Sequence, residues 1–259
     1  SLLLIWMQIY VKNKNIDQYL KEISNYLGSN IVFDVPKKNY YFVYDSNGLS
    51  FIKDANNPRE ILHVDFLKGA IRWRMKRVQH ESNIKKALGK NLSQLEIFDA
   101  TGGFLSDSII FLSLGHKVMA VEQSKIIFSL VNDAILRAEQ YFPVLKNLKF
   151  INDNSIEVYK RENREFDVIY LDPMYPEIKT NNKKNRNIEG IKKILKLENL
   201  WNKNDEIIDA FFKSSYKKII LKRPLKSKKN YSNINYQVIG KTTRFDIYIW
   251  LKLKMIQFC

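Results

Sequence analysis

The chain has 259 residues, of which 45% are hydrophobic and 13% aromatic, a composition that excludes a disordered protein. The 43 Lys and Arg against 27 Asp and Glu give a net charge of +16, which favours a polyanionic partner, although a solvated basic surface would give the same value. One cysteine, three scattered histidines and no apolar run of about 18 residues argue against disulfides, metal and membrane, so we expect a soluble cytoplasmic protein.

Residues 1–62 are predicted to form a small α+β domain. Residues 9–11 have the pattern of a strand, and apolar side chains recur at helical spacing over residues 16–27. Two β-rich runs within residues 40–52 flank Asp45-Ser46-Asn47-Gly48. The Asn-Gly pair predicts a tight hairpin in which both of these residues have positive φ.

Residues 63–90 are predicted to form a basic helical connector. Five basic side chains fall within ten residues that contain no acid: Lys68, Arg72, Arg74, Lys76 and Arg77. Such a segment is either a connecting helix with a solvated basic face or a surface that steers a phosphate backbone towards a site.

Residues 91–259 are predicted to form a larger domain in which strands and helices alternate. Strands are expected at residues 95–99, 117–122, 148–152, 166–171 and 217–221, with helices at 106–114, at 124–141 and after Asn204. This alternation is typical of a parallel sheet covered by helices on both faces. Residues 236–239 and 245–251 are expected to add two strands joined by a turn.

The first strand of this domain leads into Asp99-Ala100-Thr101-Gly102-Gly103-Phe104-Leu105-Ser106-Asp107. Ligands bind at the carboxyl ends of parallel strands, and glycines let the backbone approach a ligand closely. The third glycine of a dinucleotide fingerprint is missing, and Asp99 and Asp107 would repel a pyrophosphate. The loop therefore favours a cationic or neutral nucleoside over a nicotinamide cofactor.

Acidic and short polar residues end the next two strands. Glu122 is placed to accept hydrogen bonds from both hydroxyls of a ribose, or it is simply a neighbour of a helix N-terminus that the helix dipole stabilises. Asp153, Asn154 and Ser155 either hold the edge of an adenine or are turn residues and a helix cap.

The fourth strand runs into Asp172-Pro173-Met174-Tyr175-Pro176. Two prolines fix φ on either side of Met-Tyr, which predicts a rigid corner. An exocyclic amine of a nucleobase is a poor nucleophile because its lone pair is delocalised into the ring. Asp172, or the carbonyl of Pro173, would accept its N–H groups, while Tyr175 would stack on a base taken out of its helix.

These segments together resemble the RsmJ family of bacterial small-subunit rRNA guanine-N2 methyltransferases, which are class I S-adenosylmethionine-dependent enzymes. The likeness spans residues 60–250. Its clearest segments are Asp99-Ala100-Thr101-x-Gly103, Tyr170-Leu171-Asp172-Pro173-Met174-Tyr175-Pro176, Lys222-Arg223-Pro224 and Arg244-Phe245-Asp246-Ile247-Tyr248. The resemblance implies a Rossmann-like α/β sheet, mostly parallel with an antiparallel hairpin at the C-terminal end, preceded by the small α+β domain.

The resemblance also implies S-adenosylmethionine as cofactor and a set of site residues. Ser106 and Asp107 would contact its methionine end, Glu122 and Gln123 its ribose and adenine. The expected cofactor-binding residues are Asp99, Gly103, Ser106, Asp107, Glu122, Gln123, Asn154, Ser155 and Asp172, and the expected catalytic residues are Asp172 and Tyr175. The family usually has a glycine where Leu105 stands and a basic residue where Ser106 stands.

The implied reaction is methyl transfer to the exocyclic N2 of a guanosine in 16S rRNA, either free or in the small ribosomal subunit. The alternatives are methylation of adenine N6 in RNA or DNA and a catalytically silent RNA-binding module. The intact Asp-Pro-Met-Tyr-Pro corner disfavours the silent module. The sequence does not identify a protein partner.

Two further basic segments have two interpretations each. Residues 177–198 carry seven basic side chains against three acids, so they form either a mobile solvated loop or, as we expect from their position after the corner, a cover for substrate RNA. Lys222 and Arg223 would either touch phosphate or neutralise Asp172 and Asp246.

Overall fold

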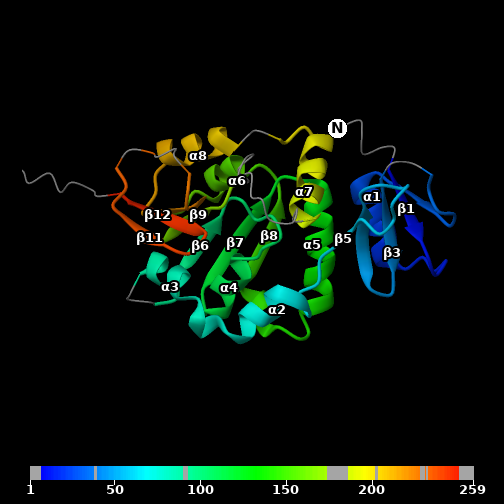
Figure 1. Cartoon of the computed structure of the whole chain (residues 1–259), viewed down its shortest axis with the longest axis horizontal. Coiled ribbons are helices and arrows are strands. Elements are labelled where there is room, and N and C mark those ends of the chain that lie inside the picture. The colour runs from blue at the N-terminus through cyan, green and yellow to red at the C-terminus, as the bar shows by residue number, and fades with distance from the viewer. Residues whose placement is uncertain are drawn as a thin grey trace, which may run out of the picture.

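The computed structural model describes residues 7–37, 40–89, 93–173, 186–201, 204–227, 231 and 233–250. Two β-sheets lie next to each other, and helix α5 (Lys125–Ala138) runs between them (Figure 1). Among the described helices, none combines the length and the apolar character that crossing a bilayer would require.

The first sheet is built from residues near the N-terminus and has the strand order β2-β1-β3-β4-β5. Its strands are β1 (Gln8–Val11), β2 (Asn30–Val32), β3 (Tyr41–Asp45), β4 (Gly48–Ile52) and β5 (Ile61–His63). Helix α1 (Gln18–Leu27) connects β1 to its parallel neighbour β2, and the carboxylate of Asp17 caps this helix by accepting from the N–H of Leu20. The predicted strand at residues 9–11 and the predicted helix at residues 16–27 are thus confirmed, with slightly different ends.

The predicted hairpin is present, but its turn differs from the expected one. Asp45 pairs with Gly48, so Ser46 and Asn47 form the two-residue loop, and Gly48 already belongs to β4. Only Gly48 of this turn has a positive φ, at +92°. The Asp45 carboxylate accepts from the N–H of Asn47, which stabilises the turn without a positive φ at the asparagine.

The predicted helical connector at residues 63–90 is less helical than expected. Its first residue still belongs to β5, the last strand of the first sheet. It continues with α2 (Gly69–Lys76) and a short 3₁₀ turn (Val78–His80), and ends with α3 (Ser82–Leu88). Helix α2 carries three of the basic residues singled out above, Arg72, Arg74 and Lys76, and Lys68 and Arg77 flank it. The helix packs against α4 (Ser108–Ser113), as Figure 1 shows.

The second sheet has the mixed α/β architecture expected from the alternating pattern. Its strands are β6 (Glu96–Asp99), β7 (Lys117–Glu122), β8 (Leu148–Asn152), β9 (Val168–Leu171), β10 (Lys218–Pro224), β11 (Tyr236–Ile239) and β12 (Thr243–Ile249). The order is β11-β12-β10-β9-β6-β7-β8. Strands β6 to β10 are mutually parallel, whereas β12 is antiparallel to β10 and β11, which confirms the predicted C-terminal hairpin.

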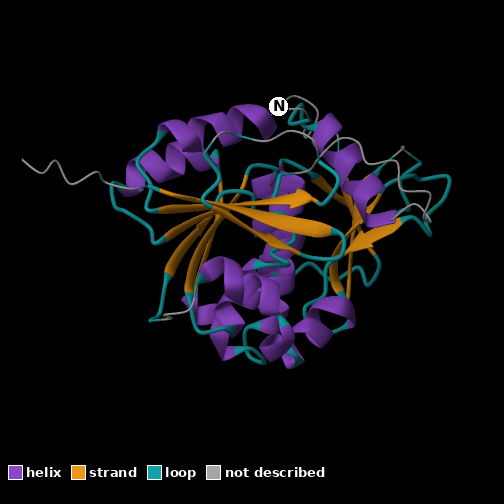
Figure 2. Cartoon of the chain, turned by 60° about the vertical axis from the view of Figure 1, so that its left-hand side comes forward, coloured by secondary structure: helices purple, strands orange, loops and turns teal. Residues whose placement is uncertain are grey.

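Helices cover both faces of this twisted sheet, as Figure 2 shows. Helices α3, α4 and α5 contribute to the apolar core on one face. Helices α6 (Ser155–Glu162) and α8 (Asn204–Lys213) contribute to the core on the other face, around Phe98 and Ile219. Helix α7 (Arg186–Leu197) packs against α5, so the second half of the expected basic loop at residues 177–198 is a helix.

The two sheets meet where the β3–β4 hairpin approaches α5. Arg137 donates to the carboxylate of Asp133 at 2.8 Å and to the carbonyl of Val64 at 2.6 Å, which ties the helix to the chain after β5. Gly48 lies directly against this ion pair. A Cβ added at Gly48 would overlap the Asp133 carboxylate and lie 2.5 Å from Nε of Arg137.

We expect Gly48→Ala to destabilise the protein more than Gly28→Ala, as measured by urea-induced unfolding. Both glycines have positive φ, which costs an alanine roughly 1–2 kcal/mol, but only Gly48 has neighbours within 4 Å of the added Cβ. Equal losses for the two variants would show that the contact with α5 contributes nothing.

Candidate functional site

The candidate site lies at the carboxyl edge of the second sheet, where the strand order reverses. From β6 the chain proceeds outward through β7 and β8, then returns to β9 on the other side of β6. Such a switch point leaves a crevice between the loops that follow the two central strands. The loop after β6 and Asp172 after β9 border this crevice, so the fold brings together two motifs that lie far apart in the sequence.

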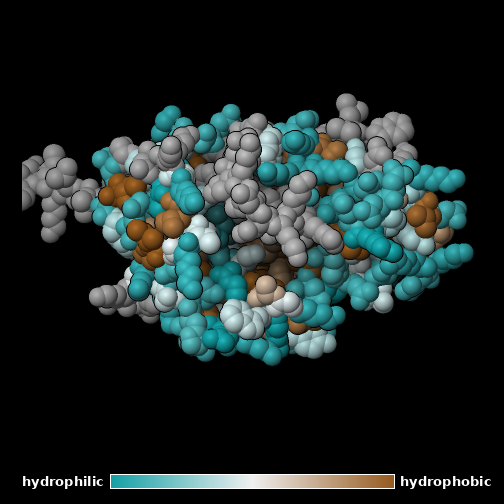
Figure 3. All heavy atoms as spheres, viewed as in Figure 1, coloured by the Kyte–Doolittle hydropathy of each residue, from teal (hydrophilic) through white to brown (hydrophobic). Residues whose placement is uncertain are grey.

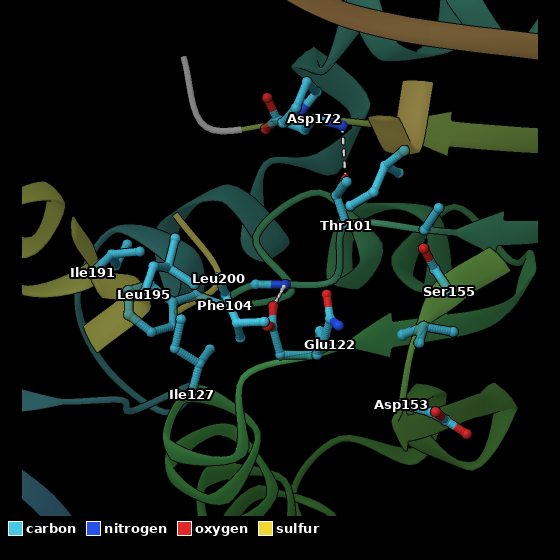
Figure 4. A pocket seen from close by; sticks show the side chains of 16 residues that line it. Thr101, Phe104, Glu122, Ile127, Asp153, Ser155, Asp172, Ile191, Leu195 and Leu200 are labelled. Carbon is cyan, nitrogen blue, oxygen red and sulfur yellow. Dashed lines mark hydrogen bonds between the residues drawn. The ribbon is translucent and has the colours of Figure 1, made fainter. Parts of the chain in front are cut away.

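A cavity with roughly 770 Å³ of empty space, open solvent at its mouth included, lies in the crevice. Its walls combine polar and apolar side chains, shown in Figure 4. The lining residues are Ala100, Thr101, Gly103, Phe104, Val121, Glu122, Gln123, Ile127, Asp153, Ser155, Asp172, Pro173, Ile191, Leu195, Leu200 and Ile207.

The loop after β6 is folded tightly against β7. The N–H of Gly102 donates to the carbonyl of Val121 at 2.9 Å, and a Cβ at Gly102 would lie 3.0 Å from that same oxygen. A larger residue here would press against the neighbouring strand, which favours glycine. Gly103 and Leu105 follow with φ of +50° and +56°, which turns the chain back towards α4.

Asp99 supports this loop from behind. Its buried carboxylate accepts from the N–H of Thr101 at 3.0 Å and from the hydroxyl of Ser108 at 2.5 Å. Burial raises the pKa of Asp99 to about 6, although both hydrogen bonds act in the opposite direction. Asp99 is not among the residues that line the cavity, so the structure gives this predicted binding residue a supporting position.

Glu122 ends β7 and faces the cavity. Its carboxylate accepts from the N–H of Gly103 at 2.8 Å, the dashed line in Figure 4, and from the N–H of Ser124 at 2.7 Å. Burial raises the pKa of Glu122 to about 7, and the nearby charges of Glu198 and Asp99 add to the shift. A carboxylate has about four acceptor positions, so two remain for the hydroxyls of a ribose.

One side of the cavity is apolar. Figure 4 shows Phe104, Ile127, Ile191, Leu195 and Leu200 gathered beside Glu122, while Asp153 and Ser155 lie on the opposite side. This arrangement suits a flat base next to a ribose: the apolar side chains contact the ring and the polar ones reach its edge.

Helix α7 forms part of this apolar wall because the residue after it is anchored to α5. Glu198 accepts from the N–H of Lys125 at 2.9 Å and from the hydroxyl of Ser124, the cap of α5. Ile194 is fully buried. From Arg186 onward, the segment expected to be a solvated RNA cover is instead a helix fixed over the cavity; residues 177–185 lie outside the described residues.

Asp172 follows β9 and stands at the mouth of the cavity. Its N–H donates to the hydroxyl of Thr101 at 2.7 Å, as drawn in Figure 4, and its side chain is 38% exposed. Oδ2 of Asp172 accepts from Lys222 at 2.8 Å. Burial raises the pKa of Asp172 and Lys222 opposes this shift, so the carboxylate is a better proton acceptor than an ordinary aspartate.

Lys222 holds a second carboxylate on its other side. Its ammonium donates to Oδ2 of Asp107 at 2.6 Å, and the same oxygen accepts from the hydroxyl of Tyr170 at 2.6 Å. Burial alone would lower the pKa of Lys222, but Asp172 and Asp107 together raise it. Of the two interpretations of Lys222, the structure supports the one in which it neutralises Asp172.

Arg74 of helix α2 adds a second cation beside Asp107, on the side away from Lys222. Its guanidinium donates to Oδ1 of Asp107 at 3.0 Å, to the carbonyl of Ser106 at 3.1 Å and to both oxygens of Glu81 at 2.7 and 3.1 Å. Burial would raise the pKa of Asp107, but Lys222 and Arg74 hold it below its usual value. Neither Ser106 nor Asp107, both expected to contact the cofactor, is among the residues that line the cavity. The connector instead engages the carbonyl of Ser106 and Oδ1 of Asp107 through Arg74.

The remaining predicted residues fall into three groups. Gly103, Gln123 and Ser155 line the cavity together with Glu122 and Asp172. Asn154 caps α6 by accepting from the N–H groups of Ile156 and Glu157 at 2.9 and 3.3 Å, which is the local role left open for it above. Tyr175 lies outside the described residues.

Several contributors to the site were not predicted, among them Thr101, Arg74 and the apolar side chains of α7. Thr101 positions Asp172 through its hydroxyl, and Arg74 joins the connector to the loop. Both residues stood within segments already singled out, but their partners are distant in the sequence. Arg223 and Arg244 lie deeper: they flank the fully buried Asp246, and Arg244 also donates to the carbonyls of Leu225 and Ser227 at 3.0 Å.

Comparison with known proteins places this fold and site in one family. A family model described as "Putative SAM-dependent methyltransferase" matches residues 29–250. Two relatives named "Ribosomal RNA small subunit methyltransferase J" are similar over most of their length. The one from Francisella tularensis subsp. novicida is 27% identical and covers 93% of this chain and 99% of its own, and the one from Desulfotalea psychrophila is 28% identical and covers 88% and 90%.

A solved structure shows the same fold. The crystal structure of a SAM-dependent methyltransferase from Neisseria gonorrhoeae superposes with a TM-score of 0.65 and 22% sequence identity, covering 94% of this chain and 96% of the other. The chain belongs to the SAM-dependent methyltransferase family, and its fold is that of a class I enzyme with S-adenosylmethionine as methyl donor.

The cavity residues fit this cofactor. Glu122 has acceptor positions for the ribose hydroxyls, the apolar wall from Phe104 to Ile191 suits the adenine, and Asp172 lies at the opposite end, near the mouth. A sulfonium is a cation, and the acidic side chains around the cavity complement its charge.

We expect the affinity for S-adenosylhomocysteine to rise with pH through about 7 and then level off. Burial raises the pKa of Glu122 in the free protein to about 7, whereas ribose hydroxyls favour the ionised carboxylate, so binding releases a proton in this range. Isothermal titration between about pH 6 and pH 8 would measure this. Glu122→Gln should bind about ten- to hundredfold more weakly and without this pH dependence.

Glu157→Gln is the matched control, because Glu157 is exposed on α6 and does not line the cavity. It should retain the pH profile of the wild type. A Glu122→Gln variant with the same profile as the wild type would contradict the assignment of Glu122 to the ribose.

Proposed function

We propose that this protein transfers a methyl group from S-adenosylmethionine to the exocyclic N2 of a guanosine in 16S rRNA, in the cytoplasm. The observation that carries the proposal is the position of Asp172 at the cavity mouth, with its backbone fixed by Thr101 and its carboxylate by Lys222. The rRNA names of the relatives and the RsmJ-like motifs support the substrate, and the net charge of +16 suits a polyanion.

In this reaction the protein has to orient the nucleophile, the exocyclic amine, because the electrophile, the methyl group on sulfur, is already reactive. When bound, S-adenosylmethionine supplies a methyl group on a positively charged sulfur, which is already reactive. The amine must direct its lone pair away from the ring and lose one proton. The chain therefore has to hold the N–H groups of the amine and orient it towards the cavity.

Asp172 has the geometry for this task. Lys222 engages Oδ2, and among the described residues nothing donates to Oδ1, which leaves Oδ1 to accept an N–H of the amine. As the nitrogen forms its new bond, the hydrogen bond to the carboxylate strengthens because positive charge develops on the amine. The raised pKa of Asp172 favours it as the first acceptor of the departing proton.

The corner beyond Asp172 completes the proposal. Pro173 lines the cavity. In the proposal, Tyr175 stacks on the guanine after the guanine leaves its helix, which accounts for an aromatic residue three positions after the acceptor.

We expect Asp172→Asn to lower kcat for methyl transfer by at least about 100-fold, because the variant loses the charge that stabilises the reacting amine. The measurement is incorporation of labelled methyl groups into free 16S rRNA and small ribosomal subunits from cells that lack the gene. Mass mapping of the product would identify the modified base and atom. Methylation of an adenine would overturn the proposed N2 specificity.

Asp167→Asn is the control for this experiment. Asp167 precedes β9, at the opposite edge of the sheet from Asp172, and it accepts from the N–H of Glu96 at 2.9 Å. This variant should keep near-wild-type turnover. If Asp172→Asn also retained it, while binding S-adenosylhomocysteine normally, the role of Asp172 would be refuted.

A further inference from the structure

The outer surface of helix α2 has an unusual composition. Trp73 is 60% exposed, and Lys76, Arg77 and His80 are exposed beside it. These positions follow the spacing of one helical face, continued by the short 3₁₀ turn. At the lower centre, where Figure 1 places α2, Figure 3 shows hydrophilic side chains next to side chains of intermediate hydropathy.

The indole of Trp73 is held between a cation and solvent. The guanidinium of Arg77 lies 4.9 Å from its ring centre, so one face of the ring contacts a positive charge. The exposure of the side chain leaves the rest of the ring accessible. An exposed large aromatic side chain does not favour solubility. Flanked by cations, however, it can stack on a nucleobase while the cations contact the phosphates attached to that base.

The acids near α2 do not cancel these charges. The two carboxylates on its inner side, Glu81 and Asp107, are both engaged by Arg74. Within the described residues, neither Lys76 nor Arg77 forms an ion pair. The outer face therefore remains positive, whereas the inner face is neutralised.

The inner face also fixes α2 relative to the catalytic site. Arg74, the neighbour of Trp73, contacts Ser106 and Asp107 in the loop after β6, and Asp107 is bridged to Asp172 by Lys222. The exposed face thus lies at the same edge of the sheet as the cavity. Trp73 does not line the cavity, so a base that stacks on it is a neighbour of the target nucleotide and not the target itself.

We propose that the face formed by Trp73, Lys76 and Arg77 is a docking surface for unpaired RNA, on which a nucleotide flanking the target stacks on Trp73. This inference rests on the proposed RNA substrate. The inference adds to the proposed function the surface that binds the RNA and the requirement that the RNA be single-stranded there. Lys76 and Arg77 contact its phosphates.

The test is the affinity for a fluorescein-labelled single-stranded RNA of mixed sequence and for the same RNA in a duplex, measured by anisotropy. Trp73→Ala should weaken single-strand binding about tenfold, Trp73→Phe should restore most of it, and duplex binding should change little, because only unpaired bases stack. Lys76→Gln with Arg77→Gln should reduce the salt dependence of single-strand binding by about 1.4 in slope.

Trp250→Ala is the matched control. Trp250 is 55% exposed, similar to Trp73, but its backbone N–H donates to the carbonyl of Lys217, just before β10, so it lies at the opposite edge of the sheet. It should bind RNA like the wild type. Trp73→Ala with wild-type affinity, or with an equal loss for both RNAs, would overturn the proposal; thermal melting of each variant checks that it is folded.

The binding assay separates this inference from the proposed reaction. If 16S rRNA is not methylated but Trp73→Ala still selectively weakens single-strand binding, the docking surface stands and the reaction fails. If methylation occurs and single-strand binding is insensitive to Trp73, the reaction stands and the docking surface is refuted.

Discussion

The site depends on one ammonium group placed between two carboxylates. Lys222 comes from the end of β10, Asp107 from the loop after β6, and Asp172 from the end of β9, so a single side chain joins three segments of the sheet edge. Two carboxylates this close together would repel each other in a desolvated crevice, and neither would be stable as a charged group. With Lys222 between them, and Arg74 on the outer side of Asp107, the charges balance and the acceptor of Asp172 is held in one place.

The loop after β6 is held in a conformation that its own sequence does not favour. Leu105 has a φ of +56°, which is unfavourable for a side chain with a Cβ, yet this leucine is fully buried. Its apolar contacts offset the backbone strain. The RsmJ-like pattern has a glycine at this position, and the positive φ gives the physical reason. Strain of this kind is typical of functional loops that the surrounding structure holds in place.

Much of the fold follows from local patterns in the sequence. The five parallel strands and the C-terminal hairpin were predictable because buried strands alternate with amphipathic helices and end in turn residues. Helix α7 was not predicted, because its many lysines indicated a solvated loop; the signal that was overlooked is the helical spacing of Ile191, Ile194 and Leu195. Strand β5 has only three residues, too few for a periodic pattern.

The site was predictable as a set of motifs but not as a set of contacts. Glu122 and Asp172 were found because each follows a strand, and the topology places such residues at one edge. Asp107 was expected to contact the cofactor, but it pairs with Arg74 and Lys222, which are 33 and 115 residues away in the chain. No local pattern carries information about such pairings, since they depend on how distant elements pack.

Helix α5 contacts both the N-terminal sheet and the cavity. Its first turn carries Ile127 into the cavity and follows Glu122 directly, while its Asp133 and Arg137 are clamped by the β3–β4 hairpin and the chain after β5. A helix of this length spans about 20 Å, and contacts with the rest of the chain hold it near both of its ends. The small sheet therefore supports the helix whose first turn lines the cavity, although none of the described residues of that sheet line the cavity.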